Sequence, residues 1–457
     1  MMLSHDKRPE QPAAWRYLSM RALALVIAFV LATSACAVGQ SVAPEARTGP
    51  DPMLPPPERN LFPTVRIAPA TGWPADAAPI PAAGLRVTRF ATGLQHPRWL
   101  LVLPNGDVLV AESNAPPGKS GVKGIKGKVM GSVMKRAGAG VPSADRITLL
   151  RDVDGDGIAE IARPFLTGLH SPFGMALIGD SLYVANADAL VVVPYRAGDT
   201  RITAQPRRVV ALPGKGDELN HHWTKSLIPS ADGRLLYVGV GSNSNVGENG
   251  MAVETNRAAV LEVNPVAGTM RVFASGLRNP VGLGFAPRSG ALWAVVNERD
   301  ELGNDLVPDY LTEVREGGFY GWPYSYYGQN LDPRVKPLQP DLVAKAIKPD
   351  YALGSHVAPL GLAFSPGGVW SGGRAGAVIG LHGSWNRRPA TGYEVVFVPF
   401  SDGRPAGPMQ SLLTGFLDAD GNARGRPVGI AVQADGAILV ADDVGNAVWR
   451  AAPARDP

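Results

Sequence analysis

GLRNPVGLGFAPRSGALWAVVNE, residues 276–298, consists of two short apolar runs separated by a turn that contains Pro287 and Gly290. This pattern is typical of a β-hairpin, because apolar residues suit buried strands and glycine suits the turn. The same theme returns in GLQHPRWLLVLPNGDVLVAES from residue 93, GLHSPFGMALIGDSLYVANA from 168, LNHHWTKSLIPSADGRLLYVGVGS from 219, HVAPLGLAFSPGGVW from 356 and RGRPVGIAVQADGAILVADD from 424. The sequence therefore predicts six copies of one hairpin.

The spacing of these copies predicts the architecture. Successive copies begin about 50 to 80 residues apart, which leaves room for two further strands in each unit. Four-stranded units repeated six times describe an all-β, six-bladed β-propeller, whose sheets pack against one another around a central channel. The alternative is an array of β-sandwich domains, but such domains rarely repeat one motif at these intervals. We assign the propeller to residues 84–457.

The composition agrees with a large, turn-rich β protein. The chain has 457 residues, of which 45% are hydrophobic, 54 are glycine and 42 are proline. This is ample material for a large core. The formal net charge of +4 is small and the charges are scattered, which argues against a nucleic-acid partner.

The first 36 residues predict export from the cytoplasm. Basic residues precede an apolar run at 23–31 that is too short for a permanent membrane span. Cys36, the only cysteine, follows small residues and predicts a lipoprotein attachment site, with ordinary signal cleavage as the alternative. Residues 37–83 are rich in Pro and Ala and predict a flexible linker. We therefore expect a periplasmic protein or a membrane-tethered lipoprotein.

Each repeat carries polar side chains directly before its first strand. The first strands of a propeller line its channel, so these side chains are expected at one end of that channel. They are Gln95, His96, Arg98, His170, Ser171, Asn220, His221, His222, Arg278, Asn279, His356, Arg424 and Arg426. The set is rich in arginine and histidine for a chain with seven histidines in all, which predicts a binding or catalytic site there.

Residues 276–322 carry the most specific motifs, which are GLRNP, the acidic segment NERDELGND at 297–305 and the turn GGFYGW. With these motifs, and over about residues 85–450, the chain resembles the pyrroloquinoline quinone (PQQ) dependent soluble sugar dehydrogenases, in particular their glucose/sorbosone dehydrogenase branch. The resemblance implies a six-bladed propeller that binds PQQ and Ca²⁺. It also implies oxidation of a sugar, either an aldose or an aldehyde such as sorbosone.

The resemblance implies which residues contact the quinone. Arg278 would stabilise negative charge at the reactive carbonyl, and Asn279 would bind the same edge. Arg424 and Arg426 would pair with the carboxylates of PQQ, because guanidinium groups bind carboxylates in a bidentate manner. These two arginines stand two residues apart, a strand period that predicts both on one face.

Two further parts of the cofactor site follow from the same resemblance. The family places a lysine against the cofactor in the segment that corresponds to residues 380–389, where this chain offers His382 and Arg387. Two consecutive backbone carbonyls of the acidic loop bind calcium in the family, and here they would be those of Asp300 and Glu301. Calcium prefers such oxygen ligands.

The segment HHWTKSL at 221–227 is predicted to contain the catalytic base. Imidazole has an ordinary pKa of about 6.5 and can therefore take a proton near neutral pH. The resemblance implies that His222 takes the hydroxyl proton while hydride leaves the sugar, with His221 as an orienting neighbour. The alternative is that one or both histidines only form hydrogen bonds within a blade.

Two charged segments each allow more than one interpretation. DVDGDGIAE at 152–160 places Asp152, Asp154 and Asp156 at alternate positions, which suits either a structural calcium loop or a plain Asp-Gly turn. The lysine-rich stretch at 118–140 suits a solvated loop, or a surface for an anionic partner or lipid head groups.

The sequence as a whole predicts a PQQ-dependent sugar dehydrogenase that passes electrons to a cytochrome or a membrane quinone. One alternative is a calcium-dependent sugar lactonase on the same fold, with Glu, Asn and Asp metal ligands at the channel centre. Another is a non-catalytic propeller that binds carbohydrate or protein, because a fold does not determine an activity.

Overall fold

The computed structural model describes residues 44–58, 66–116, 136–138, 140–214 and 221–454. The predicted export signal with Cys36, and most of the basic stretch at 118–140, lie outside these residues. Among the described helices, none is both long and apolar enough to cross a membrane.

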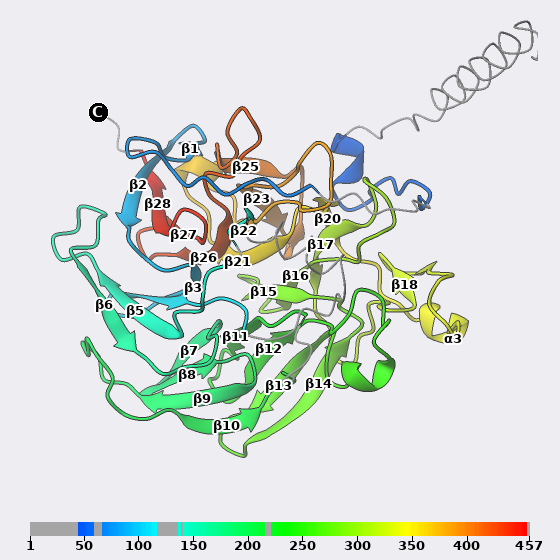
Figure 1. The fold of residues 1–457 in the computed structure, drawn as a ribbon, viewed down its shortest axis with the longest axis horizontal. Helices are drawn as coiled ribbons and strands as arrows, with labels where there is room; N and C mark the ends of the chain where they lie inside the picture. Colours follow the sequence, from blue (N-terminus) through cyan, green and yellow to red (C-terminus); the bar gives the residue numbers. More distant parts are fainter. Residues whose placement is uncertain (1–43, 59–65, 117–135, 139, 215–220, 455–457) are drawn as a thin grey trace, which may run out of the picture. The chain divides into compact units, whose positions relative to one another are not determined.

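Six antiparallel sheets surround a central channel, so the prediction of an all-β, six-bladed β-propeller is confirmed (Figure 1). Blades 1 to 3 contain β3 (Pro97–Val102), β4 (Val108–Glu112), β5 (Arg146–Arg151) and β6 (Ile161–Leu166); β7 (Met175–Ile178), β8 (Ser181–Ala185), β9 (Ala189–Pro194) and β10 (Arg207–Ala211); and β11 (Lys225–Pro229), β12 (Leu236–Val240), β13 (Ala259–Asn264) and β14 (Thr269–Ser275). In each blade the first strand along the chain lies at one edge of the sheet.

The other three blades contain β15 (Pro280–Phe285), β16 (Leu292–Val296), β17 (Pro308–Glu313) and β20 (Tyr351–Ser355); β21 (Pro359–Ser365), β22 (Gly376–Leu381), β23 (Glu394–Ser401) and β25 (Gln410–Thr414); and β26 (Pro427–Val432), β27 (Ile438–Asp442), β28 (Ala447–Pro453) and β2 (Leu85–Ala91). The short elements are β1 (Ile80–Pro81), β18 (Ser325–Tyr326), β19 (Asn330–Leu331), β24 (Arg404–Pro405), α3 (Pro340–Val343), η1 (Pro44–Arg47), η2 (Met251–Glu254) and η3 (Val369–Ser371).

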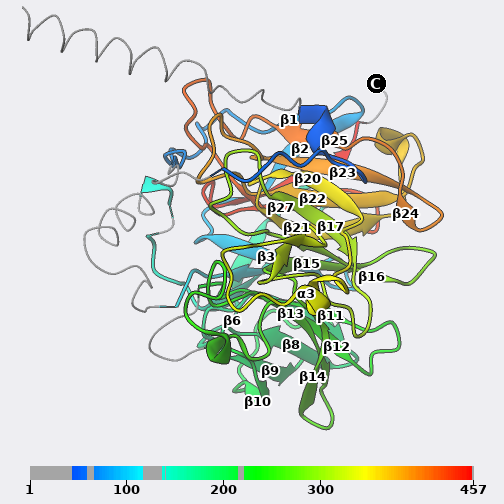
Figure 2. The same cartoon turned by 90° about the vertical axis from the view of Figure 1, so that its right-hand side faces the viewer.

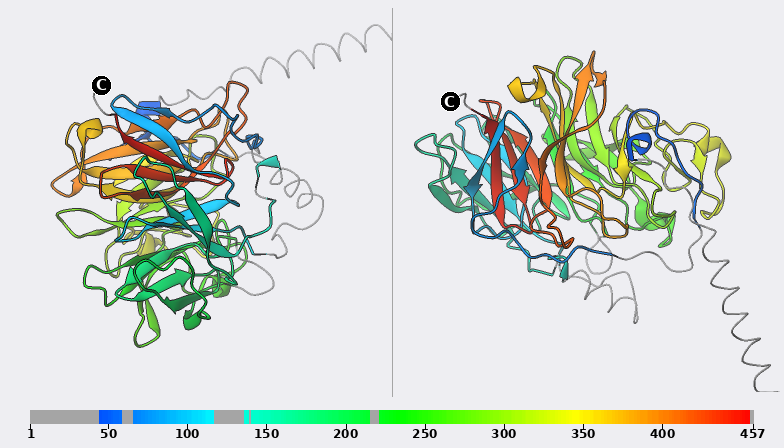
Figure 3. Two further views of the ribbon diagram at one scale, coloured as in Figure 1. Left: turned by 90° about the vertical axis from the view of Figure 1, so that its left-hand side faces the viewer. Right: turned by 90° about the horizontal axis from the view of Figure 1, so that it is seen from above.

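The ring is closed by strands from the two ends of the described chain. β2 pairs with β28 from Leu85 opposite Pro453 to Ala91 opposite Val448, so the sixth blade combines one early strand with the last three (Figure 3). This pairing covers the edge of β28, and an uncovered strand edge is a site for unwanted association.

Glycines in the repeats let neighbouring inner strands approach closely. A Cβ atom on Gly282 of β15 would lie 2.7 Å from the Leu362 nitrogen of β21, and one on Gly429 of β26 would lie 2.7 Å from the Arg98 carbonyl of β3. Equivalent positions of successive repeats are therefore neighbours around the channel. The six inner strands consequently begin at the same end of it, as the repeats predict.

Part of the segment predicted to be a flexible linker lies against the propeller. β1 pairs with β25 at the edge of the fifth blade (Figure 2), and isolated bridges join Gly49 to Ala352 and Ala70 to Ala423. Trp73 packs edge-on against Phe416 and Trp449, at centroid distances of 5.4 Å and 5.2 Å. Backbone bridges and aromatic contacts fix these residues, which Pro and Ala content alone does not reveal.

The fourth blade carries an insertion between β17 and β20. The small sheet of β18 and β19 and the helix α3 lie within it. Asp332 follows β19 and is buried, with its amide donating to the carbonyl of Tyr324. Through Asp332 the insertion reaches the acidic loop that follows β16, because Arg299 of that loop forms an ion pair with this carboxylate.

Candidate active site

His222 lies just before β11 and has one ring nitrogen with a fixed partner. Its Nδ1 lies 2.8 Å from the carbonyl oxygen of Ser242, to which a protonated Nδ1 donates. The tautomer with Nδ1 protonated leaves the lone pair on Nε2. Burial holds the pKa of His222 well below its ordinary value, and the neighbouring His221 and Arg278 lower it further. A neutral imidazole with a free Nε2 is what a general base requires.

Gly241 brings His222 and Asn279 together. A Cβ atom at this position would lie 2.5 Å from the Cβ of His222 and would overlap the Oδ1 of Asn279. Asn279 is buried, and its Oδ1 has no hydrogen-bond partner among the described residues. An acceptor buried without a donor costs about 1–3 kcal/mol, so this oxygen marks a place for a donor supplied from outside the protein.

The hydrogen-bond donors of Arg278 contact oxygens of the protein itself. It is 3% exposed, and Nε and Nη2 donate to the backbone and side-chain oxygens of Asn245 at 3.2 and 3.0 Å. Its Nη1 donates to the carbonyl of Glu298 at 2.7 Å, and Nη2 also donates to a carboxylate oxygen of Asp300 at 3.0 Å. The structure therefore places Arg278 beside the predicted site but uses its donors to hold the acidic loop.

Arg426 and Arg424 differ from one another. Arg426 is 3% exposed and lies 4.7 Å from the ring centre of Tyr393, and its Nε has no hydrogen-bond partner among the described residues. Arg424 is partly exposed, and within the described chain no hydrogen bond or ion pair of its guanidinium is seen. Both precede β26 rather than lying in it, so the strand period is not what relates them. Nη1 and Nη2 of Arg426 donate to the carbonyls of His382 and Ala68 at 3.4 and 3.3 Å, so Nε is its donor without a partner among the described residues.

His382 belongs to an ionic cluster whose members come from the fifth, sixth and first blades. Its Nε2 lies 3.0 Å from Oδ2 of Asp443, which also pairs with Arg98 and lies 3.6 Å from Nε2 of His96. Burial, with smaller contributions from Arg426 and Arg98, lowers the pKa of His382 to about 4, although Asp443 acts to raise it. Burial alone would raise the pKa of Asp443, but His382, His96 and Arg98 hold it well below its usual value.

Asp443 and Ser242 were not among the residues predicted from the sequence, although a signal for them exists. The second strand of each repeat ends in a polar residue, as in VAES, VGVGS, VVNE and VADD. Because the second strand runs antiparallel to the first, its last residue returns to the end of the channel where the first strand begins. The polar ends of both strands together predict the site more completely than the first alone.

The donors of Arg387 are used by the acidic loop and by its own segment. Its Nη2 donates to a carboxylate oxygen of Asp305 at 2.6 Å, and Nε donates to the carbonyl of Asn304 at 3.0 Å. Arg47 of the N-terminal segment pairs with the same carboxylate of Asp305. Arg387 therefore joins the acidic loop to the segment after β22, with its remaining Nη1 donating to the carbonyl of Pro389.

The carbonyls predicted to bind calcium already accept hydrogen bonds. The carbonyl oxygen of Asp300 accepts from Nε and Nη2 of Arg299 at 3.0 and 2.7 Å. The carbonyl oxygen of Glu301 accepts from Nη1 of Arg334 at 2.9 Å. A guanidinium group at each predicted ligand oxygen does not fit a divalent cation at the same place.

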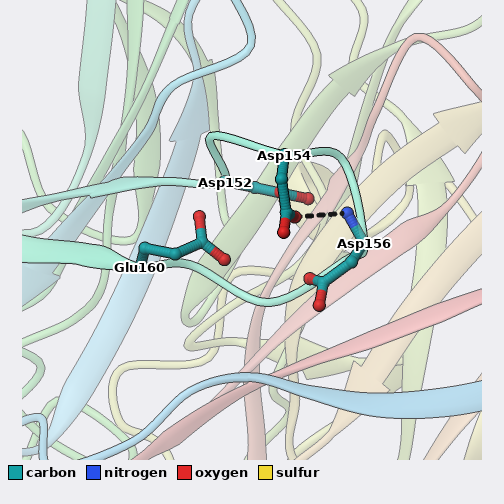
Figure 4. A group of neighbouring side chains, drawn as sticks. All are labelled: Asp152, Asp154, Asp156 and Glu160. Atoms are coloured by element: carbon teal, nitrogen blue, oxygen red, sulfur yellow. Dashed lines mark hydrogen bonds between the residues drawn. The ribbon is translucent and has the colours of Figure 1, made fainter.

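A second group of oxygen ligands lies at the outer edge of the first blade. The carboxylates of Asp152, Asp154, Asp156 and Glu160 converge in the turn between β5 and β6, with one oxygen of each within 4.8 Å of the others (Figure 4). Backbone amides of the turn donate to Asp152 and Asp154. Both readings from the sequence, a structural calcium loop and an Asp-Gly turn, agree with this geometry.

Comparison with known proteins identifies the family of the chain. The sequence model of the TrAA12-like family matches residues 148–313 and 341–450. A protein of Borreliella burgdorferi named only as uncharacterized is 30% identical over 294 residues, which cover 62% of this chain and 76% of that protein.

Other relatives carry functional names. A pyrroloquinoline quinone-dependent sugar dehydrogenase of Hypocrea jecorina is 23% identical over 380 residues, which cover 73% of this chain and 78% of that protein. The holo form of the pyranose dehydrogenase PQQ domain from Coprinopsis cinerea superposes with a TM-score of 0.66 and 21% identity, covering 84% of this chain and all of that one. The resemblance predicted from the sequence is thereby confirmed, and the chain belongs to the TrAA12-like family.

Proposed function

We propose that the chain is a PQQ-dependent dehydrogenase that oxidises a sugar. The observation that carries the proposal is that His222 and Asn279 lie next to each other across Gly241. The contact of Nδ1 with the Ser242 carbonyl leaves Nε2 of His222 basic, and Oδ1 of Asn279 has no partner among the described residues. A base beside a polar group that lacks a partner within the described residues is a usual arrangement of an active site. The names of the relatives supply the cofactor and substrate class.

The positively charged residues fit a tricarboxylate quinone. Arg426 has a buried Nε without a partner among the described residues, and Arg424 has a guanidinium without a hydrogen bond there. Guanidinium groups with free donors bind carboxylates in short, charge-assisted hydrogen bonds. His382 lies next to Arg426, whose Nη1 reaches the His382 carbonyl at 3.4 Å. The two arginines would hold the acid groups of PQQ, whereas Nε2 of His382 already pairs with Asp443.

The protein residues would act on the substrate as follows. PQQ, when bound, supplies the acceptor for the hydride of the sugar. His222 would accept the hydroxyl proton at Nε2, and the Ser242 carbonyl would stabilise the resulting imidazolium through Nδ1. Asn279 would take a donor at Oδ1. Arg278, held between Asn245 and Asp300, would keep the loop in place and supply positive charge nearby.

The setting of the reaction is part of the proposal. Electrons would leave to a cytochrome or a membrane quinone, and the protein would be periplasmic or tethered through a lipid on Cys36. The support is the basic and apolar pattern of residues 1–36. Glucose, another aldose and sorbosone all suit the proposed chemistry.

Retention of quinone tests the proposal. The purified protein is incubated with PQQ, with and without calcium, and desalted, and the retained quinone absorbance is measured for the wild type and for Arg424→Ala/Arg426→Ala. We expect retention by the wild type, and a PQQ affinity weaker by several orders of magnitude in the double variant, because one broken buried ionic contact costs about 2–5 kcal/mol. Arg207→Ala/Arg208→Ala, on the exposed strand β10, is the matched control.

The outcomes separate the candidate functions. Wild-type protein that never retains PQQ but hydrolyses sugar lactones in calcium would be a lactonase. Protein that binds sugar or protein without either activity would be a binding propeller. Equal PQQ affinity of wild type and double variant would remove the two arginines from the site while leaving the dehydrogenase proposal in place.

A further inference from the structure

The acidic loop after β16 contains its own cations. The Asp300 carbonyl accepts two donors from Arg299 and a longer one, at 3.3 Å, from the side-chain amide of Asn245. The Asp300 carboxylate pairs with Arg278 at 3.0 Å and accepts from Nδ2 of Asn386 at 2.8 Å. The backbone and side-chain oxygens of this residue are therefore both supplied with donors by the protein.

The insertion of the fourth blade supplies the counter-charge. Asp332 is 1% exposed and pairs with Arg299 through Oδ2 and with Nε of Arg334 through Oδ1 at 3.0 Å. Arg334 in turn donates to the Glu301 carbonyl at 2.9 Å. Burial of Asp332 acts to raise its pKa, but the hydrogen bond from Arg334 and the charge of Arg299 hold it below the ordinary value. One buried carboxylate thus fixes two guanidinium groups against consecutive carbonyls.

We propose that Arg299 and Arg334, held by Asp332, take the place of a divalent cation at the carbonyls of Asp300 and Glu301, so that this loop keeps its form without calcium. A calcium ion needs six to eight oxygen ligands, and here the two carbonyl oxygens already accept guanidinium donors. A cation at these oxygens would therefore have to displace the guanidinium groups of Arg299 and Arg334, which Asp332 holds in place.

The inference concerns the metal requirement of the site proposed above to bind quinone, but its test needs no quinone. The acidic turn at 152–160 could bind calcium by itself and obscure the result. Calcium titrations therefore use Asp154→Asn/Asp156→Asn as the parent protein. We expect this parent to bind no calcium at concentrations up to about 1 mM, the weak end of protein calcium sites. Its unfolding temperature should also be the same in calcium and in chelator.

The second arm removes the guanidinium groups. In the same parent, Arg299→Gln/Arg334→Gln frees the two carbonyls and the carboxylate of Asp332. We expect a lower unfolding temperature that calcium raises and magnesium does not, because the freed oxygens form an irregular site that suits the larger ion. Arg271→Gln, an exposed arginine paired with Glu262 and Glu316, is the control and should show no calcium effect.

Two results would overturn the proposal. One is a bound calcium ion in the parent, with a chelator-sensitive unfolding temperature. The other is an arginine double variant that folds but responds to calcium no more than the parent does. If the double variant does not fold, the titration of the parent still decides between the two possibilities. Failure of PQQ binding would count against the proposed function and would leave these calcium results unaffected.

Discussion

At the scale of single residues, the two ring nitrogens of His222 have different roles. Nδ1 is fixed by the carbonyl of Ser242, and the Ser242 hydroxyl lies 3.2 Å from the same nitrogen. The ring of His221 meets it edge-on at 4.6 Å. His221 is exposed and His222 is only partly exposed, so the pair combines a ring whose Nδ1 has a fixed partner with a ring nearer to solvent.

His222→Gln tests the proposed base. We expect turnover to fall about 100-fold or more, because general base catalysis typically contributes that much, while retention of PQQ persists. Steady-state sugar oxidation and quinone absorbance after desalting measure the two properties. His170→Gln, an exposed histidine that pairs with Asp188, should leave both unchanged. Unaltered turnover in His222→Gln would remove the assignment.

Gly241→Ala tests the contact between the base and Asn279. The added Cβ would overlap Asn279 and crowd the Cβ of His222. We expect lower kcat with a smaller loss of stability, because the crowded groups lie at the channel end rather than between blades and a displacement near 1 Å can cost about 100-fold in rate. Kinetics and thermal unfolding of the same preparation check this. Gly233→Ala, in the turn after β11, is the control for a glycine far from the site. A normal kcat in Gly241→Ala would contradict the proposed contact between His222 and Asn279.

At the scale of elements, the segment before β2 contributes to the last blades. Nε1 of Trp73 donates to Oδ2 of Asp442 at 2.7 Å, and Trp449 donates to the same oxygen at 3.0 Å. Asp442 also accepts the amides of Arg426 and Gly445 at 2.8 Å. The N-terminal segment therefore helps to satisfy the carboxylate that holds the backbone just before β26.

Trp73→Phe tests this role of the segment. The aromatic contacts with Phe416 and Trp449 should largely persist, but Asp442 loses one donor, which costs about 1–3 kcal/mol for a buried charged group. Denaturant unfolding measures the loss. Trp370→Phe is the comparison, since Trp370 packs on Phe397 in the fifth blade. Equal stability of Trp73→Phe and wild type would show that the segment adds nothing to this blade.

At the scale of the whole molecule, three histidines with lowered pKa values make the propeller sensitive to acid. The pKa values of His96, His222 and His382 are all lowered, in each case mainly by burial. These residues come from the first, third and fifth blades. Protonation of these histidines at acid pH therefore destabilises several blades rather than one hairpin.

The pH dependence of stability follows from the direction of these shifts. His382 has a folded pKa of about 4 and an unfolded value of about 6.5. The unfolded chain thus binds more protons between these values, so the stability is fully present above pH of about 6.5 and is lost as the pH falls toward 4. His382→Gln should flatten the loss by about 3 kcal/mol, at about 1.4 kcal/mol per pKa unit. Chemical denaturation at pH values from neutral to acid measures the free energy of unfolding. The prediction would be contradicted if this free energy fell with pH as steeply in His382→Gln as in the wild type. His170→Gln is the control.

Local sequence patterns are sufficient to predict the number of blades and the end of the channel where the polar residues gather. Both follow from local patterns, because a hairpin is formed by neighbouring residues and its repeats must pack in the same way. The positions of His222, Asn279 and Arg426 at the starts of inner strands could be predicted for this reason. The family resemblance could be seen for the same reason, since its motifs are continuous stretches.

The tertiary structure alone decided which of these polar groups are free. Arg98 pairs with Asp443, 345 positions away, and Asp300 accepts from Asn386, 86 positions away. Arg278 and Arg387 look like open cations in the sequence, yet oxygens from distant loops occupy them. A side chain's donors are consumed by whichever acceptors the fold brings within about 3 Å. Because those acceptors lie far along the chain, only the assembled propeller shows what remains for a ligand.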